Sequence, residues 1–212
     1  MIVLAGTIGA GKSSLAEALG EHLGTEVFYE SVEDNPVLDL YYKDPEQYAF
    51  LLQIHFLNKR FKSIKEAYKA DNNILDRSIF EDALFMELNH KNGNVTSVEM
   101  DTYRDLLDNM LEELEGMPKK RPDLLVYVDV SLNTMLERIK LRGRDFEQVD
   151  NQPELEEYYA QVHGEYPAWY AAYDKSPKLR IDGDKIDFVN NSEDRTRVLN
   201  MIDTKLKELN LL

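Results

Sequence analysis

Eight residues near the start of the chain, Gly6 to Ser13 (Gly-Thr-Ile-Gly-Ala-Gly-Lys-Ser), have the pattern of a phosphate-binding loop, G-x-x-x-x-G-K-[ST]. Glycines in such a loop let successive backbone N–H groups face a phosphate chain, and the next helix adds partial positive charge. Lys12 adds a full charge, and Ser13 is placed to bind Mg²⁺. The alternative is a chance glycine-rich turn. The pattern therefore predicts binding of a nucleoside triphosphate. The predicted phosphate contacts are Gly6, Thr7, Gly9, Ala10, Gly11, Lys12, Ser13 and Ser14.

Two carboxylates, Glu30 and Asp76, come at the ends of expected strands. A carboxylate that faces a triphosphate is unfavourable unless it holds a metal, accepts a hydroxyl proton or pairs with a cation. Arg77, directly after Asp76, offers such a cation. The alternatives are a solvated loop carboxylate at Glu30 and a structural ion pair at Asp76. The pattern favours phosphoryl transfer to a hydroxyl group, with one of these carboxylates as the general base.

A cluster of basic residues lies in the segment 138–147 of an otherwise acidic chain. Arg138 and Arg142 are four residues apart and so share one face of a helix. Gly143 is expected to end that helix and to free Arg144. The alternative is a solvated basic helix face. Together with the phosphate loop, the cluster predicts an arginine lid that closes over phosphates.

Gln53 and Arg60 lie two turns apart on one side of a long expected helix. A glutamine can make paired donor and acceptor contacts to the edge of a base. The alternative is a structural amide. The aromatic residues of the segment 158–173 are expected to pack in the core, and the four histidines lack metal-ligand spacing.

The sequence Ser78-Ile-Phe-Glu81 has the form of a helix capping box, so Glu81 is expected to be structural. Asp82 follows in the first helical turn and can face the same crevice as the phosphate loop. The alternative is favourable placement at the positive end of the helix dipole.

Short apolar runs alternate with longer helical patterns, which indicates an α/β fold with a parallel sheet covered by helices on both faces. The expected strands are 2–5, 27–30, 74–76, 124–130 and 178–182. The expected helices are 12–23, 46–69, 79–90, 96–115, 132–142, 154–173 and 192–209, with Ser131 capping the fifth. In such sheets ligands bind beyond the carboxyl ends of the strands, so the residues that follow four of the strands should converge on one crevice. With no repeat or linker, residues 1–212 are predicted to be one domain.

The composition excludes some classes of partner and of metal site. The formal net charge is −15, from 40 acidic and 25 basic side chains, which disfavours nucleic acid and anionic membranes as partners. The chain has no cysteine, so disulfides and thiolate metal sites are excluded. No apolar run approaches the ~20 residues of a membrane span. We expect a cytoplasmic protein.

Taken in order along the chain, these residues resemble the deoxynucleoside kinase family, and most of all its bacterial deoxyadenosine and deoxyguanosine kinases. The resemblance covers essentially the whole chain. Beyond the phosphate loop, it rests on Tyr29-Glu30 with Asn35-Pro36, Gln53, Asp76-Arg77-Ser78 with Glu81-Asp82, Arg138-x-x-x-Arg142-Gly-Arg144 with Glu147, and Ile181-Asp-Gly-Asp184. The phosphate loop alone is shared by many ATPases, whereas this ordered set is far more specific. It implies a P-loop kinase-type fold of three layers with five parallel strands.

The resemblance also implies roles for single residues. Glu30 would take the proton of the substrate 5′-hydroxyl, Arg77 would hold that hydroxyl and the transferred phosphate, and Asp76 would support Mg²⁺ with Ser13. The remaining roles fall into four groups. They are the lid over the ATP phosphates (Arg138, Arg142, Arg144), the contacts to the sugar 3′-hydroxyl (Tyr42, Glu147), the base readers (Gln53, Arg60, Asp82) and the segment against the donor adenine (Asp182, Gly183, Asp184).

The family implies further properties of the whole protein. Its members are usually dimers, so a homodimer or a heterodimer with a paralogous subunit is expected, with an end-product deoxynucleoside triphosphate as feedback inhibitor. Many relatives have proline directly after the glutamate, where this chain has Ser31, which changes the rigidity of the loop and leaves the role of Glu30 intact. Arg60 with Asp82 suits a purine, but related pairs also serve cytosine, so adenine, guanine and cytosine all stay open.

Two rival functions are weaker. A nucleoside monophosphate kinase of the thymidylate type needs extra cations around its acceptor, and Glu30 would repel an acceptor phosphate. A GTPase switch typically carries N-K-x-D, and the segment Asn58-Lys59-Arg60-Phe61 lacks the aspartate and lies within an expected helix.

Overall fold

The computed structural model describes residues 1–30, 32, 34–67, 73–116 and 121–212. Five strands of this part of the chain form one sheet, in which every pair is parallel and the order is β2-β3-β1-β4-β5. The strands are β1 (Ile2–Ala5), β2 (Val27–Phe28), β3 (Ile74–Asp76), β4 (Leu124–Asp129) and β5 (Lys178–Asp182). The predicted five-stranded parallel sheet is confirmed.

The first strand lies in the middle of the sheet, because Ile2 is in register with Ile74 of β3 on one side and with Leu124 of β4 on the other. Each of its residues is buried, as expected for a continuous apolar run covered on both faces. The chain thus crosses from one side of β1 to the other, and ligands bind at such a switch point, beyond the carboxyl ends of the strands.

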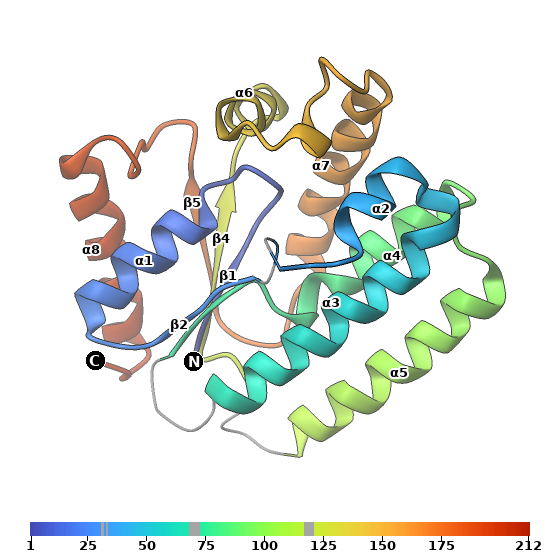
Figure 1. The fold of residues 1–212 in the computed structure, drawn as a ribbon. Helices are drawn as coiled ribbons and strands as arrows, with labels where there is room; N and C mark the ends of the chain where they lie inside the picture. The colour runs from blue at the N-terminus through green and yellow to red at the C-terminus, as the bar shows by residue number, and fades with distance from the viewer. Residues whose placement is uncertain (31, 33, 68–72, 117–120) are drawn as a thin grey trace.

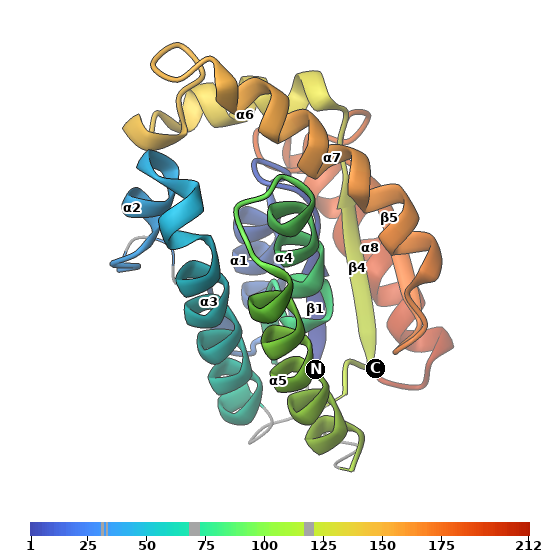
Figure 2. The ribbon, with the colours of Figure 1, turned by 90° about the vertical axis from the view of Figure 1, so that its right-hand side faces the viewer.

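Helices cover both faces of the sheet. The helical segments are α1 (Lys12–Leu23), α2 (Leu38–Lys43), α3 (Pro45–Ala67), η1 (Ile79–Glu81), α4 (Asp82–Lys91), α5 (Ser97–Glu115), α6 (Leu132–Arg142), η3 (Asp145–Glu147), α7 (Glu154–Ala172) and α8 (Ser192–Glu208). Figures 1 and 2 show α1 and α8 on one face and α4 and α7 on the other, with α3 and α5 packed against α4. The three-layer prediction is confirmed. Among the described residues, no helix is long and apolar enough to cross a membrane.

The ends of α6 follow the expected local signals. The Ser131 hydroxyl accepts a hydrogen bond from the backbone N–H of Thr134 at 3.3 Å, as an N-cap does. Gly143 ends the helix with φ 69°, a left-handed conformation that favours glycine. Both predictions are confirmed, and the glycine is what turns the chain so that Arg144 leaves the helix axis.

Several boundaries differ from the expectations. Strand β2 ends at Phe28 and not at residue 30, and β4 ends at Asp129 and not at residue 130. The short segments α2 and η3 had no sequence signal strong enough to predict them. The predicted helix end at residue 69 and the Ser31 position both lie outside the described residues.

The predicted capping box at Ser78 is wrong in its second half. The Ser78 hydroxyl does accept a hydrogen bond, from the backbone N–H of Phe80. Glu81, however, does not close the box. Its carboxylate turns inward to Arg77 and to the backbone N–H of Gly6, because a buried guanidinium is a stronger partner for a carboxylate than a backbone N–H of a helix terminus.

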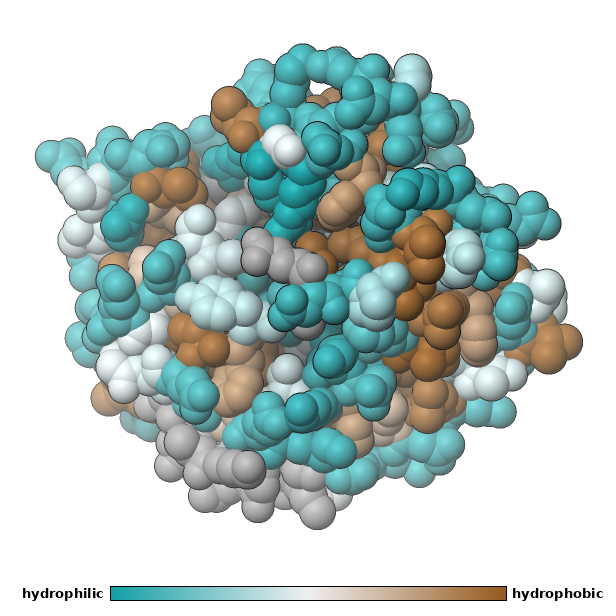
Figure 3. All heavy atoms as spheres, in the orientation of Figure 1, coloured by the Kyte–Doolittle hydropathy of each residue, from teal (hydrophilic) through white to brown (hydrophobic). Residues whose placement is uncertain are grey.

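Apolar side chains are also found on the outside of α2 and α3. Leu40 is 39 % exposed and Leu51 is 50 % exposed. Figure 3 shows hydrophilic atoms over α6 at the top of the molecule and a group of hydrophobic atoms over α2 and α3 on the right. Leu52, the residue after Leu51, is buried, so α3 has apolar side chains on more than one side. Gln53 is buried as well.

Candidate active site

The phosphate loop connects β1 to α1 in a conformation that needs its glycines. Gly6, Gly9 and Gly11 have φ values of 144°, 73° and 95°, all in the region that side chains with a Cβ rarely adopt. At Gly6 a Cβ would also lie 2.5 Å from the backbone oxygen of Val128. The strand–loop–helix context of the motif is confirmed, with the N-terminus of α1 directed at the loop.

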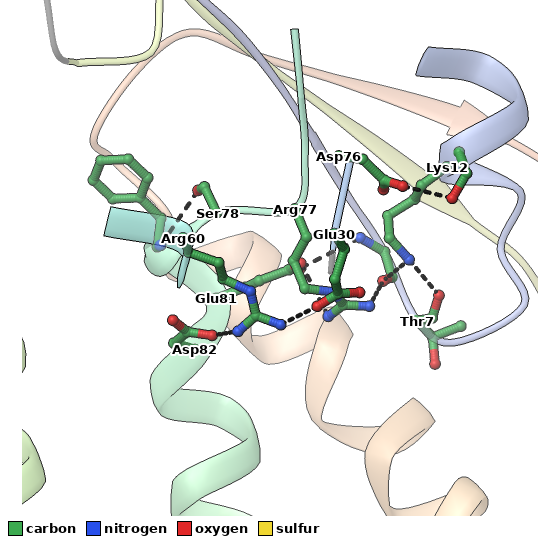
Figure 4. A network of polar contacts seen from close by, with 12 residues as sticks. Thr7, Lys12, Glu30, Arg60, Asp76, Arg77, Ser78, Glu81 and Asp82 are labelled. Carbon is green, nitrogen blue, oxygen red and sulfur yellow. Dashed lines mark hydrogen bonds and ion pairs between the residues drawn. The ribbon is translucent and has the colours of Figure 1, made fainter. Parts of the chain in front are cut away.

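Lys12 is buried, and its side chain turns back over the loop. Its Nζ donates hydrogen bonds to the backbone oxygens of Gly6 and Thr7, both at 2.9 Å (Figure 4). Burial and, after it, the charge of Arg77 lower the pKa of Lys12 from 10.5 to about 8. A phosphate bound at this point would replace the two carbonyl oxygens as partner of the Lys12 ammonium and would offer it a full negative charge.

Ser13 and Asp76 meet beside the loop, where the Ser13 hydroxyl donates to Asp76 Oδ2 at 2.5 Å. Asp76 Oδ1 is buried and has no hydrogen-bond partner among the described residues. Burial raises the pKa of Asp76, although the charge of Lys12 opposes it. An unpartnered carboxylate oxygen beside a hydroxyl fits Mg²⁺, which takes oxygen ligands and keeps several waters. Among the described residues, no group of three or more His, Asp or Glu side chains is placed to hold a metal ion by itself.

Arg77 follows the last residue of β3 with φ 72°, a left-handed backbone that is unfavourable for a side chain of this size. Its backbone N–H donates to Leu4 of β1 at 2.9 Å. The buried guanidinium donates from Nε to Glu30 at 3.2 Å and from Nη2 to the backbone oxygen of Gly6 at 3.0 Å. This backbone conformation directs the Arg77 side chain across the sheet edge toward the phosphate loop.

Glu30 and Asp82 are joined through Arg60 of α3, which pairs with both carboxylates (Figure 4). Burial alone would raise the pKa of Glu30, but the charges of Arg77 and then Arg60 offset it and lower the pKa to about 2. Arg60 also lies over the Phe56 ring, 4.7 Å from its centroid. The three predicted residues from distant parts of the chain therefore form one buried network.

The basic cluster forms the other wall. Arg142 and Arg144 both pair with the buried Glu147, the latter at 3.5 Å from Nη1 to Oε1. Arg138 instead reaches down, donating to the backbone oxygens of Ala10 at 2.9 Å and Gly183 at 3.0 Å. The lid segment therefore contacts both the phosphate loop and the loop after β5.

These groups surround a cavity of 590 Å³, a size typical of small-ligand sites. Many of the predicted site residues line it. They are Gly9, Lys12, Ser13, Glu30, Tyr42, Gln53, Arg60, Asp76, Arg77, Arg142, Arg144 and Glu147. Tyr42 packs beside the lid, with its ring centroid 5.4 Å from that of Phe146. One cavity is thus lined both by residues of the phosphate loop and by the arginine–carboxylate network.

The other predicted residues do not line this cavity. Asp82 reaches it only through Arg60. The remaining residues of the phosphate loop do not line the cavity either. They are Gly6, Thr7, Ala10, Gly11 and Ser14. Asp182 binds Lys185 at 2.6 Å, and Asp184 accepts a hydrogen bond from the Ser131 backbone at 3.0 Å. Gly183 is linked to the phosphate loop through Arg138, which donates to the Gly183 backbone oxygen.

Sequence reasoning missed several residues of the site. Glu81 was expected to cap a helix, and Tyr166 was grouped with the core aromatics. Both contact Arg77. Phe85 also contacts it, with the guanidinium carbon 4.9 Å from the ring centroid. Only the bulk and spacing of these residues are visible in the sequence, and neither property distinguishes a site neighbour from a core residue.

Comparison with known proteins agrees with the geometry. The family model "Deoxynucleoside kinase" matches residues 2–207. The chain belongs to the deoxynucleoside kinase family. It is 59 % identical to the deoxyguanosine kinase of Lactobacillus johnsonii over 209 residues, which cover 99 % of this chain and 93 % of that protein. It is 52 % identical to the deoxyadenosine kinase of Lactobacillus acidophilus, with coverage of 99 % and 97 %.

A solved structure shares the fold. Deoxyadenosine kinase from M. mycoides with bound dATP superposes with a TM-score of 0.78 at 34 % identity, covering 95 % of this chain and 98 % of that chain. The kinase-type fold of this deoxynucleoside kinase is therefore established along with its family.

Proposed function

We propose that this kinase transfers the γ-phosphate of ATP to the 5′-hydroxyl of a purine deoxynucleoside. The observation that supports it most directly is the pairing of Glu30 with Arg77 at 3.2 Å, in the same cavity as Lys12 of the phosphate loop. A hydroxyl acceptor needs a carboxylate and a cation at that place, whereas a phosphorylated acceptor would be repelled by Glu30. Nothing in the relatives favours the thymidylate type of kinase.

At the donor end, we propose that the loop residues and Lys12 bind the ATP phosphates, and that Arg138, Arg142 and Arg144 cover them. Phosphoryl transfer depends mainly on positioning and on neutralisation of charge, which these cations supply. When bound, Mg²⁺ would neutralise phosphate oxygens, and Ser13 with Asp76 would hold it. The loop after β5, with Asp182, Gly183 and Asp184, would lie against the donor adenine.

At the acceptor end, Glu30 would accept the 5′-hydroxyl proton as the new P–O bond forms. A carboxylate with a pKa of about 2 is a weak base, so Glu30 must first lose part of its positive surroundings. Arg60 is the partner that can leave, because a nucleobase bound to Arg60 competes with Glu30 for its guanidinium. Binding of the correct base would thus raise the pKa of the catalytic carboxylate.

The base itself would be read by Gln53, Arg60 and Asp82. An arginine fork matches O6 and N7 of guanine, and a carboxylate accepts from the amino groups of adenine or guanine. Tyr42 and Glu147 would hold the 3′-hydroxyl. The relatives include both deoxyguanosine and deoxyadenosine kinases, so both purines are proposed as substrates.

Other properties follow from the relatives. The M. mycoides kinase was solved with dATP and, separately, with dCTP bound, which supports feedback inhibition by a deoxynucleoside triphosphate here. We propose that residues 1–212 act as one kinase domain, as a homodimer or with a paralogous subunit, in the cytoplasm and without nucleic acid or membrane partners.

The proposal is tested with ATP, Mg²⁺ and each of the four deoxynucleosides, with the 5′-monophosphate products separated by chromatography. Deoxyguanosine or deoxyadenosine should give the largest kcat/KM. A preference for thymidine would refute the assignment of the base readers, and turnover of no deoxynucleoside would refute the proposal.

A further inference from the structure

One tyrosine of α7 contacts two groups of the active site without lining the cavity. Tyr166 is buried, and its hydroxyl accepts a hydrogen bond from Arg77 Nη1 at 2.8 Å. The same hydroxyl donates to the backbone oxygen of Gly6 at 3.0 Å. Because Arg77 Nη2 also donates to that oxygen at 3.0 Å, the three groups close a triangle. The single proton of the hydroxyl is therefore committed to Gly6.

Glu81 holds the same two groups from the other side. Its Oε1 pairs with Arg77 Nη1 at 3.0 Å, and its Oε2 accepts from the backbone N–H of Gly6 at 3.4 Å. Figure 4 shows Glu81 and Arg77 within one network with Glu30 and Lys12. Glu81 and Tyr166 thus fix both the acceptor-side arginine and the first residue of the phosphate loop.

The carbonyl of Gly6 has more donors than it needs. Lys12, Arg77 and Tyr166 all donate to it, whereas a carbonyl oxygen has two lone pairs. Lys12 can therefore move to a phosphate without leaving the buried oxygen unsatisfied, because Arg77 and Tyr166 still donate to it. Tyr166 and Arg77 would then keep the loop in place while the lysine moves.

The Tyr166 ring is itself held tightly. It stacks on Tyr127 of β4 with centroids 6.0 Å apart and an angle of 6° between the planes, and Trp169 packs edge-on at 5.9 Å. A side chain locked by stacking makes hydrogen bonds of fixed direction. The hydroxyl thus acts as a rigid spacer between Arg77 and Gly6.

We propose that Tyr166, together with Glu81, is a positioning residue that sets the place of Arg77 relative to the phosphate loop. This inference rests on the proposed function, in which Arg77 contacts the acceptor hydroxyl and the loop holds the donor. The distance between donor and acceptor is then set by the Arg77–Tyr166–Gly6 triangle. Small errors in such a distance lower the rate strongly.

The test is Tyr166→Phe, which removes one hydroxyl and keeps the stacked ring. A hydrogen bond to a charged group is at stake, so kcat should fall about tenfold to a hundredfold. KM for ATP and for the nucleoside should change less than about threefold, because Tyr166 does not line the cavity proposed to hold them. The matched control is Tyr173→Phe, which removes a hydroxyl that hydrogen-bonds to Ser176 at 2.9 Å, away from Arg77 and Gly6, and should leave kcat unchanged.

Three further measurements separate positioning from general destabilisation. The Tm values of the two Phe variants should be similar, and Glu81→Gln should lower kcat in the same way as Tyr166→Phe. In an Arg77→Lys background, Tyr166→Phe should have little further effect, because both changes act on the same guanidinium. Equal kcat for Tyr166→Phe and Tyr173→Phe, or full additivity with Arg77→Lys, would overturn the inference. An inactive wild-type protein would instead refute the proposed function.

Discussion

Replacement of Glu30 by glutamine tests the acceptor half of the site. Glutamine has nearly the same shape but cannot take the 5′-hydroxyl proton. In the structure, Glu30 accepts from Arg77 Nε at 3.2 Å and pairs with Arg60, and an amide oxygen can still accept one of these bonds. The variant therefore removes the base with limited rearrangement of its neighbours.

The expected loss is that of general-base assistance, about two to four orders of magnitude in kcat, or about 2.7–5.4 kcal/mol of activation free energy. KM for ATP should stay within about threefold of wild type, because the hydrogen bonds and ion pairs described for Glu30 go to Arg60 and Arg77 and not to the phosphate loop. The assay is steady-state phosphorylation of deoxyguanosine, with Tm measured in parallel. Glu26→Gln is the matched control, since Glu26 is an exposed carboxylate directly before β2, and it should have wild-type kinetics.

A near-normal kcat for Glu30→Gln would refute the reasoning, because it would show that no proton transfer to Glu30 limits the reaction. An equal loss in Glu26→Gln would mean that the effect is one of overall charge and not of a base.

Two other predictions concern Arg60 and Lys12, which both line the cavity. Arg60→Ala should change the ratio of kcat/KM among the four deoxynucleosides more than it changes phosphoryl transfer to the preferred one. An unchanged ratio would remove Arg60 from base reading. Because burial lowers the pKa of Lys12 to about 8, its charge is present below that pH and is lost above it, so kcat/KM for ATP should fall as pH rises through about 8. A profile that stays flat up to the ordinary lysine value of 10.5 would contradict this prediction.

Much of the fold could be predicted because its signals are local. The strand Ile2–Ala5 is a continuous apolar run, Ile74–Asp76 is a short apolar pair that ends in a polar residue, and Gly143 ends α6 where a left-handed residue is required. The two-residue strand Val27–Phe28 was overextended, because pairing with β3 stops where the chain turns into the site. The short helix α2 has too few residues for a periodic pattern, and tertiary contacts with α3 hold it.

The candidate site, like the fold, could be predicted only in part. Lys12, Glu30 and Arg77 could be named because they follow strands, and strand ends converge at one edge of the sheet. The contacts made by Tyr166 and Glu81 could not be named, because a buried tyrosine in a helix and a glutamate three residues after a serine each have a common structural explanation. Their role depends on which groups the fold places opposite them.

The central claim is that the phosphate acceptor is the 5′-hydroxyl of a nucleoside. The most direct measurement compares turnover of deoxyadenosine with that of deoxyadenosine monophosphate under the same ATP and Mg²⁺ concentrations. The account predicts conversion of the nucleoside to its 5′-monophosphate and no conversion of the monophosphate to a diphosphate. Activity on the monophosphate alone would contradict it.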